Sequence, residues 1–328
     1  MNKKNYSYSW VKLFCFFLLF VNIRAVYAQG AHSTDAIWVI DQSIDNAVIK
    51  LSGDGRKTLA RIKESKPPTD IEIDQRDGAI WVTYKADSSL VKYSADGKDK
   101  LLEVKKTFCT PRHSSLSLKE NAIWIGSWTQ GELIKFSLEG KQLLRIQNLG
   151  NIYEVLVSPF DDTIWVGDQK LNKFIHFSSS GKMLGFTQRR LGKPFNLAID
   201  ANNGSLWAIF HDSGKVVKFS HQGKFIFLVE DFNLPEAITI DPQDGSVWVT
   251  DVSRGELTHI SSEGEVLKKI GGFTGCSGLS LIDPEEKTFW MANTAQGEII
   301  KFSTTGEVLD RVRVGGNPKS VIVYKRSK

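Results

Sequence analysis

The chain has 328 residues, with 42 Lys and Arg against 37 Asp and Glu and a formal net charge of +5. Four of the basic residues and none of the acidic ones lie in residues 1–28, so residues 29–328 carry 38 basic and 37 acidic side chains. This near-neutral balance argues against nucleic acid as a partner. The sequence has no CxxC, CxxCH or HExxH motif, which argues against attached haem and the common zinc sites.

Residues 1–28 have the pattern of a secretory signal peptide. Basic residues up to Lys12 precede an apolar run from Leu13 to Val21, and Ala28 ends a stretch suited to cleavage before the next residue. Nine apolar residues are too few to span a bilayer. We therefore expect an exported protein, secreted or periplasmic, with no membrane span once the signal is removed. Arg24 leaves an uncleaved anchor as the alternative reading.

A tryptophan recurs every 41 to 43 residues through the rest of the chain, each time inside a short apolar run such as AIWVID or SVWVTD. The seven are Trp38, Trp81, Trp124, Trp165, Trp207, Trp248 and Trp290. A glycine after a strand-like run repeats in step with them, at Gly55, Gly97, Gly140, Gly181, Gly223, Gly264 and Gly306. A period of about 40 to 45 residues with several short strands in each unit is typical of a β-propeller.

Each unit reads as four strands separated by turns. In the fifth unit we expect strands at 196–200, 205–210, 215–220 and 224–229, because ANNG, HDSG and HQG between them have turn chemistry. The first unit begins at Ala36 with a second strand, and residues 319–324 match the innermost strand of the other units. The sequence therefore predicts an all-β, seven-bladed β-propeller in residues 29–328, a single domain whose first blade is completed by the C-terminal strand.

In such a fold the loop before each innermost strand and the turn after each second strand surround one mouth of the central channel. The first channel-facing residues are predicted to be Asp70, Ser115, Glu154, Asn196, Ala237, Gly278 and Ser320. The preceding position carries Thr69, Ser114, Tyr153, Phe195, Glu236, Ser277 and Lys319. Variation at a repeated position is what a binding surface on a repeat scaffold would show, and a water-filled channel lining would show it too.

Two sets of side chains at this mouth are candidates for a site. Glu154, Asn196 and Glu236 offer hard oxygen ligands for a divalent cation such as Ca²⁺, with a simple hydrated lining as the alternative. The candidate ligand-binding residues are Asp70, Arg112, His113, Trp128 and Phe210. An aromatic side chain exposed at a mouth, as we expect for Trp128 and Phe210, can stack on a sugar or a flat ligand. The basic residues could select an anion or could be solvated edge charge.

Other polar residues have structural interpretations. The turn residues Asp41, Asp168 and Asp251 are expected to accept backbone hydrogen bonds. His176 and His259 fall within third strands and are expected to be structural.

The unit PEAITIDPQDGSVWVTDVSRGELTHISSEGEV resembles the NHL repeat, and the resemblance extends over nearly all of residues 29–328. Streptogramin lyases and gluconolactonase-like propellers are more distantly similar. The first resemblance implies catalytic histidines, but the chain has Phe195 in PFNLAID and Glu236 in PEAITID where the lyases place them. The second implies a divalent cation, and Glu236 falls where the acidic ligand of those propellers would be.

The sequence thus favours a binding module that engages an unidentified protein or small molecule at the channel mouth. The alternative is a metal-dependent lactone hydrolase or C–O lyase that uses the same mouth. A third hypothesis, in which the chain is a subunit of a larger assembly, places function on the outer edges of the blades.

Overall fold

A computed structural model describes residues 34–43, 45–105 and 107–326 of the chain. Over these ranges the chain forms seven four-stranded antiparallel sheets, the blades. Blade 1 contains β28 (Pro318–Tyr324), β1 (Ala36–Asp41), β2 (Ala47–Ser52) and β3 (Thr58–Lys63). Blade 2 contains β4 (Asp70–Ile73), β5 (Ile80–Tyr84), β6 (Ser89–Tyr93) and β7 (Lys100–Lys105). Blade 3 contains β8 (Pro111–Ser117), β9 (Ala122–Ser127), β10 (Glu132–Ser137) and β11 (Gln142–Ile146).

The remaining blades follow in chain order. Blade 4 contains β12 (Ile152–Val157), β13 (Ile164–Asp168), β14 (Lys173–Phe177) and β15 (Met183–Phe186). Blade 5 contains β16 (Pro194–Ile199), β17 (Leu206–Phe210), β18 (Lys215–Phe219) and β19 (Phe225–Val229). Blade 6 contains β20 (Pro235–Ile240), β21 (Val247–Asp251), β22 (Glu256–Ile260) and β23 (Val266–Gly271). Blade 7 contains β24 (Cys276–Leu279), β25 (Thr288–Asn293), β26 (Glu298–Ser303) and β27 (Val308–Arg313).

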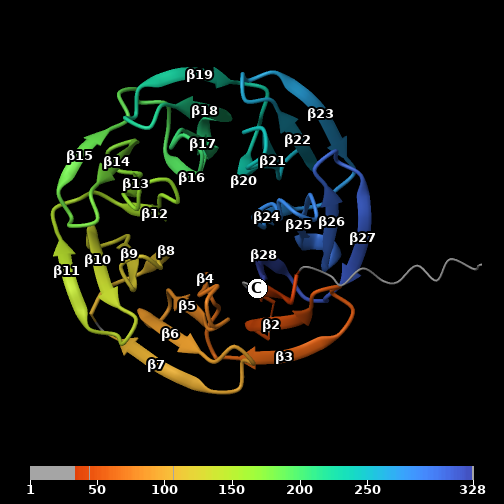
Figure 1. The fold of residues 1–328 in the computed structure, drawn as a ribbon, viewed down its shortest axis with the longest axis horizontal. Helices are drawn as coiled ribbons and strands as arrows, with labels where there is room; N and C mark the ends of the chain where they lie inside the picture. The colour runs from red at the N-terminus through yellow and green to blue at the C-terminus, as the bar shows by residue number, and fades with distance from the viewer. Residues whose placement is uncertain (1–33, 44, 106, 327–328) are drawn as a thin grey trace, which may run out of the picture. The chain divides into compact units, whose positions relative to one another are not determined.

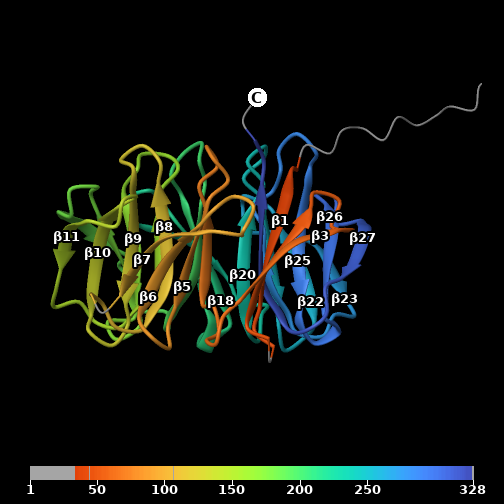
Figure 2. The same ribbon diagram turned by 90° about the horizontal axis from the view of Figure 1, so that it is seen from below.

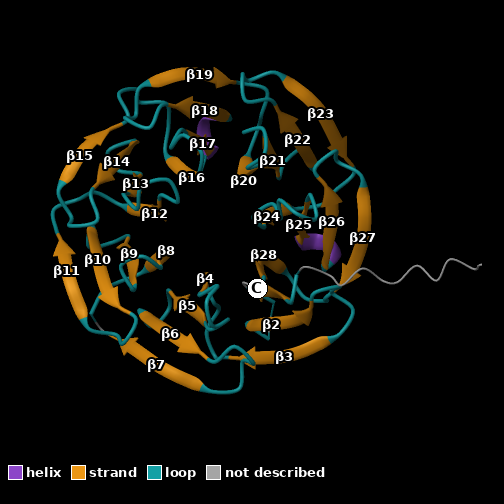
Figure 3. Cartoon of the chain, viewed as in Figure 1, coloured by secondary structure: helices purple, strands orange, loops and turns teal. Residues whose placement is uncertain are grey.

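The blades are arranged around one axis, with β4, β8, β12, β16, β20, β24 and β28 nearest to it (Figure 1). Seen from the side, the innermost strands run roughly along that axis (Figure 2). Only two single-turn helices interrupt the strands and loops of the described residues, at His211–Ser213 and Thr294–Gln296 (Figure 3). Neither of these described helices is long and apolar enough to cross a membrane.

The ring is closed by pairing between the two ends of the described chain. Strand β28 runs antiparallel to β1, from Ala36 opposite Tyr324 to Asp41 opposite Pro318. The predicted all-β, seven-bladed propeller with its first blade completed by the C-terminal strand is therefore confirmed. The predicted signal peptide at residues 1–28 lies outside the described residues.

Each tryptophan belongs to the core between its own blade and the next. Trp38, for example, clusters with Ile71, Ile80 and Val82 of blade 2, while Trp290 of blade 7 clusters with residues of blade 1. All seven indoles are essentially inaccessible to solvent. The inter-blade cores thus repeat seven times, once for each tryptophan, which is the physical meaning of the sequence period.

A cross-strand cation or imidazole covers each indole on its own blade. Trp248 of β21 pairs with His259 of β22, whose ring stacks on the indole with a centroid distance of 4.3 Å. His176 stacks on Trp165 in the same way at 4.1 Å. In the other five blades a lysine takes this position, at Lys50, Lys92, Lys135, Lys218 and Lys301. The structural role expected for the two histidines is confirmed.

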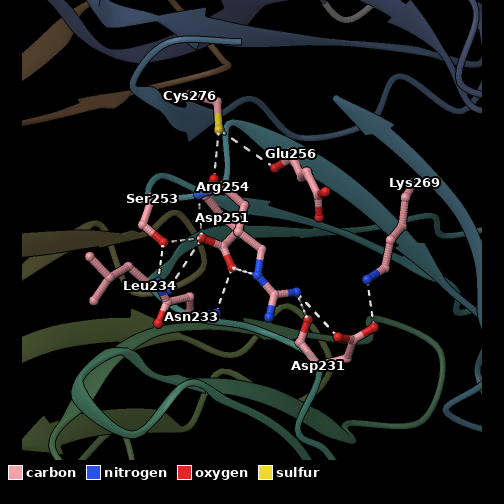
Figure 4. Close-up of polar contacts among 9 residues, drawn as sticks. All are labelled: Asp231, Asn233, Leu234, Asp251, Ser253, Arg254, Glu256, Lys269 and Cys276. Atoms are coloured by element: carbon pink, nitrogen blue, oxygen red, sulfur yellow. Dashed lines mark hydrogen bonds and ion pairs between the residues drawn. The ribbon is translucent and has the colours of Figure 1, made fainter. Parts of the chain in front are cut away.

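In blades 1, 4 and 6 a turn carboxylate, Asp41, Asp168 or Asp251, ties the loop before the innermost strand to the turn after the second strand. Asp251, at the end of β21, accepts hydrogen bonds from the backbone N–H groups of Asn233, Leu234 and Arg254 (Figure 4). Burial opposes ionisation here, but these N–H donors outweigh it and lower the pKa of Asp251. The buried Cys276 thiol of blade 7 donates to the Asp251 carbonyl oxygen. The predicted structural role of these aspartates is confirmed.

We predict that Gly306→Ala destabilises the protein, because two costs coincide at this turn. Gly306 has φ +79°, and a Cβ built on it would lie 2.6 Å from Cη2 of Trp248 in the preceding blade. A left-handed backbone and an overpacked contact together cost about 2 to 4 kcal/mol of unfolding free energy. Urea unfolding measures this cost. Gly185→Ala is the matched control, because a Cβ there meets nothing within 4 Å; equal losses at the two positions would contradict the packing argument.

Candidate functional site

The register of the innermost strands shows which side chains occupy equivalent positions at the mouth. In blades 2, 4 and 5, Asp70, Glu154 and Asn196 lie two residues before the partner of their blade's tryptophan. In blade 3, Ser115 pairs with Trp124 itself. His113 is therefore the equivalent of Asp70, and the expectation that Ser115 fills this position is wrong.

Four successive blades thus place polar side chains at one register position: Asp70, His113, Glu154 and Asn196, which we call the polar arc. The other three blades place Ala237, Gly278 and Ser320 there. At this register position the larger polar side chains are confined to one side of a ring whose scaffold is repeated seven times.

The polar arc is a connected set of contacts across blades 2 to 5. The backbone N–H and hydroxyl of Ser114 both donate to Oδ2 of Asp70, at 2.8 and 2.9 Å. His113 Nδ1 lies 3.9 Å from Asp70 Oδ1 and 3.8 Å from Glu154 Oε1. Asn196 Nδ2 donates to Glu154 Oε2 at 3.0 Å. His113 therefore stands between two carboxyl groups, one of which is also held by an amide.

Burial and like charge raise the pKa values of two glutamates at this cluster, Glu154 and Glu72. The Glu154 side chain is almost fully buried, and desolvation together with the Asp70 charge raises its pKa to about 7, although His113 and the Asn196 amide oppose the shift. Glu72 lies two residues beyond Asp70 on β4, and burial, Asp70 and Glu154 raise its pKa well above the usual range. Glu154 can therefore gain or lose a proton near neutral pH.

A row of stacked side chains runs beside the polar arc over blades 3 to 5. The Arg112 guanidinium lies between two rings, with its Cζ 4.9 Å from the Trp128 centroid and 5.1 Å from the Tyr153 centroid. Tyr153 packs on Phe195 at 4.9 Å, and Phe195 stacks on His211 at 4.4 Å. We call these five residues the stacked row. It meets the polar arc where the Tyr153 and His113 rings lie 5.5 Å apart.

Phe210 does not have the exposure expected of it. Its side chain is fully buried and packs edge-on against Phe174 and Phe219, with centroids 5.8 and 6.5 Å away. Because β17 is a middle strand of its blade, packing takes Phe210 into the inter-blade core. The next residue, His211, joins the stacked row instead and approaches the Pro235 carbonyl oxygen through Nδ1 at 2.8 Å.

The three candidate metal ligands are only partly brought together. Asn196 Nδ2 donates a hydrogen bond to Glu154. Asn196 Oδ1 accepts one from the backbone N–H of Ile238 at 3.3 Å, so the amide oxygen that would bind a metal already has a partner. Burial raises the pKa of Glu236, although the charges of Lys319 and His211 act to lower it. The described residues contain no group of three His, Cys, Asp or Glu side chains able to hold a metal. The side chains as placed do not fit a shared cation, and the metal site stays a prediction.

Sequence reasoning left Glu72, Tyr153, Phe195, His211 and Lys85 out of the candidate set. The signal for Glu72 is its place two residues after Asp70, on the same side of β4. Both cysteines of the described part, Cys109 and Cys276, are free thiols. Burial raises the pKa of the Cys276 thiol to about 12, so it is an unreactive packing residue.

Comparisons with known proteins support the fold. No protein-family model matches the chain, and no curated protein matches it. Among solved structures, a functionally unknown protein from Desulfotomaculum acetoxidans aligns with TM-score 0.76 and 14% identity over 90% of this chain and 100% of that one. A protein from Lactobacillus plantarum aligns with TM-score 0.73 and 14% identity over 89% and 100%. Virginiamycin B lyase from Staphylococcus aureus aligns with TM-score 0.63 and 13% identity over 77% and 87%. At such identities the likeness establishes the propeller fold alone.

We predict that Glu154→Gln changes the pH dependence of stability. A carboxyl with a raised folded pKa binds its proton more tightly in the folded state, so the wild type loses stability as pH rises from the ordinary value of 4.5 to about 7. Glu154→Gln has no such titration, so its unfolding free energy relative to that of the wild type should rise by roughly 2 kcal/mol from pH 5 to pH 8. Guanidinium unfolding at several pH values measures the difference. Glu230→Gln, at an exposed position, is the control; parallel profiles for all three proteins would contradict the assignment.

Proposed function

We propose that this chain is an exported NHL-type propeller that acts as a binding module, with a small polar molecule as its ligand at the channel mouth. The observation that carries the proposal is the polar arc: four neighbouring blades supply Asp70, His113, Glu154 and Asn196 at one position, while three supply small residues. The propeller fold shared with the solved structures is the scaffold for this site.

The polar arc is costly for folding, which supports a role in function. A carboxyl buried as deeply as that of Glu154, near a second carboxyl, destabilises the folded state whenever it ionises. Perturbed titratable groups that meet at one place are typical of binding and catalytic sites. Ala237, Gly278 and Ser320 on the opposite side place little side-chain volume at the same level.

A thermal-shift screen of small polar molecules tests the site. The protein is purified from the exported fraction, where the proposed cleavage gives an N-terminus at Gln29. Ligands that raise the melting temperature of the wild type should lose most of that effect with Glu154→Gln, because the amide carries no charge and replaces one of the two acceptor oxygens with an NH₂ donor. Asp161→Asn is the control, since Asp161 pairs with His221 outside the polar arc. Hits that stabilise all three proteins equally would show that the ligand binds elsewhere.

A second candidate function is a C–O lyase or lactone hydrolase, with or without a divalent cation at Glu154, Asn196 and Glu236. One observation favours it: Glu154, with a pKa of about 7, lies 3.8 Å from His113, so the two can act as an acid–base pair at neutral pH. The fold-level likeness to virginiamycin B lyase suggests virginiamycin B, beside a panel of simple lactones, as the substrates to assay.

Turnover of such lactones, in Ca²⁺ or Mg²⁺ and in chelator, tests the second candidate. The enzyme reading predicts activity that falls at least about a hundredfold in Glu154→Gln and in His113→Asn. The control Asp161→Asn should keep the wild-type rate. No turnover of any lactone by the wild type, with or without the cations, would rule out this reading and leave the binding module.

A further inference from the structure

Two cationic side chains meet on one indole at the edge of the mouth. Lys85 follows β5 in blade 2, and its Nζ lies 5.3 Å from the Trp128 ring centroid. Arg112 of blade 3 places its Cζ 4.9 Å from the same centroid. Desolvation and then the charge of Arg112 lower the pKa of Lys85, so the two cations are close enough to repel each other. Bringing them together costs free energy that a bound anion would offset.

Neither cation has an acidic partner among the described residues. No ion pair or side-chain hydrogen bond within these ranges involves Lys85 Nζ or the Arg112 guanidinium, whereas Arg145 and Arg254 each contact a carboxylate. One buried N–H group at the same place, Arg112 Nε, has no acceptor in the described structure. The Trp128 Nε1 group is unpaired too, but most of the core indoles share that property, so it carries no argument here. Buried guanidinium donors are normally satisfied, so an unpaired one beside a second cation calls for an acceptor from outside the chain.

We propose that Lys85, Arg112 and Trp128 form an oxyanion site that holds the carboxylate or phosphate group of the mouth ligand. The planar guanidinium, fixed between the Trp128 and Tyr153 rings, presents its remaining N–H groups in the fork that carboxylates and phosphates accept, and Lys85 adds a point charge. The inference rests on the proposed function and names the chemical class of its ligand.

The position of this site agrees with a ligand that also reaches the polar arc. Arg112 and His113 are consecutive residues on β8, and Tyr153 contacts both of them. One small molecule can thus place its oxyanion at Lys85 and Arg112 and its uncharged polar groups near Glu154 and Asn196. The carboxylates of the polar arc also discourage the anionic end from binding there, which fixes the orientation of the ligand.

Calorimetric titration with two probes, inorganic phosphate and benzoate, tests the oxyanion site at constant ionic strength. We expect at least one probe to bind with Kd on the order of 1 mM, since a fragment makes few contacts. Lys85→Gln and Arg112→Gln should each weaken that binding by about tenfold. The matched control is Arg189→Gln, because Arg189 also stacks on a ring, Phe225 of the outer strand β19, but lies outside the mouth.

Each outcome of the titration decides a point. If only phosphate or only benzoate binds, the probe that binds identifies the group that the site accepts. Either result supports the site if Lys85→Gln weakens the binding. This holds even if Arg112→Gln does not fold, because Lys85→Gln tests the site independently. The proposal is overturned if neither probe binds the wild type, or if Lys85→Gln binds as tightly as Arg189→Gln. A ligand that carries a carboxylate or phosphate and depends on Glu154 but not on Lys85 would remove the oxyanion site and leave the proposed function. Anions that depend on Lys85 alone would do the reverse.

Discussion

The indole of one tryptophan per blade, packed against the next blade, is the contact on which the rest of the ring depends. It is covered on its own blade by a lysine or a histidine, and a Cβ added to the turn glycine of the next blade would meet it at Gly55, Gly97, Gly223 and Gly306. Because the same contact closes the interface between blades 7 and 1, no blade has a free face. The core between blades is therefore complete without any contribution from the mouth.

This division of labour follows from position along the innermost strands. Leu156 and Ala198 pack against the cores between blades, while Glu154 and Asn196, two residues earlier on the same sides of their strands, bond to each other at the mouth. The first set must stay apolar for the ring to close. The second set contributes nothing that the core needs, so it can carry charged and amide groups, and it does so on one side of the ring. The proposed ligand site uses this freedom.

The fold could be predicted from the sequence because the tryptophan spacing reports a repeated packing contact, and the ring closure followed from matching residues 319–324 to an innermost strand. The polar arc was within reach as well: Asp70, His113, Glu154 and Asn196 each lie eleven residues before a tryptophan, a spacing that would have placed His113 in the ring in preference to Ser115. Phe210 was wrongly expected to be exposed, because its place in the sequence at the end of a middle strand does not show whether its side chain faces the mouth or the core between blades. The stacked row could not be predicted, because it depends on distances between side chains of different blades and the spacing of residues along the sequence does not give those distances.

The most direct test of the account is a crystal structure of the protein with a stabilising ligand bound. We predict that the ligand lies at the mouth formed by the starts of β8, β12 and β16, in contact with Glu154 or Asn196 and with its anionic group at Arg112. A ligand bound only on the outer strands of the blades, or at the opposite end of the ring, would contradict the claim that the polar arc is the functional site.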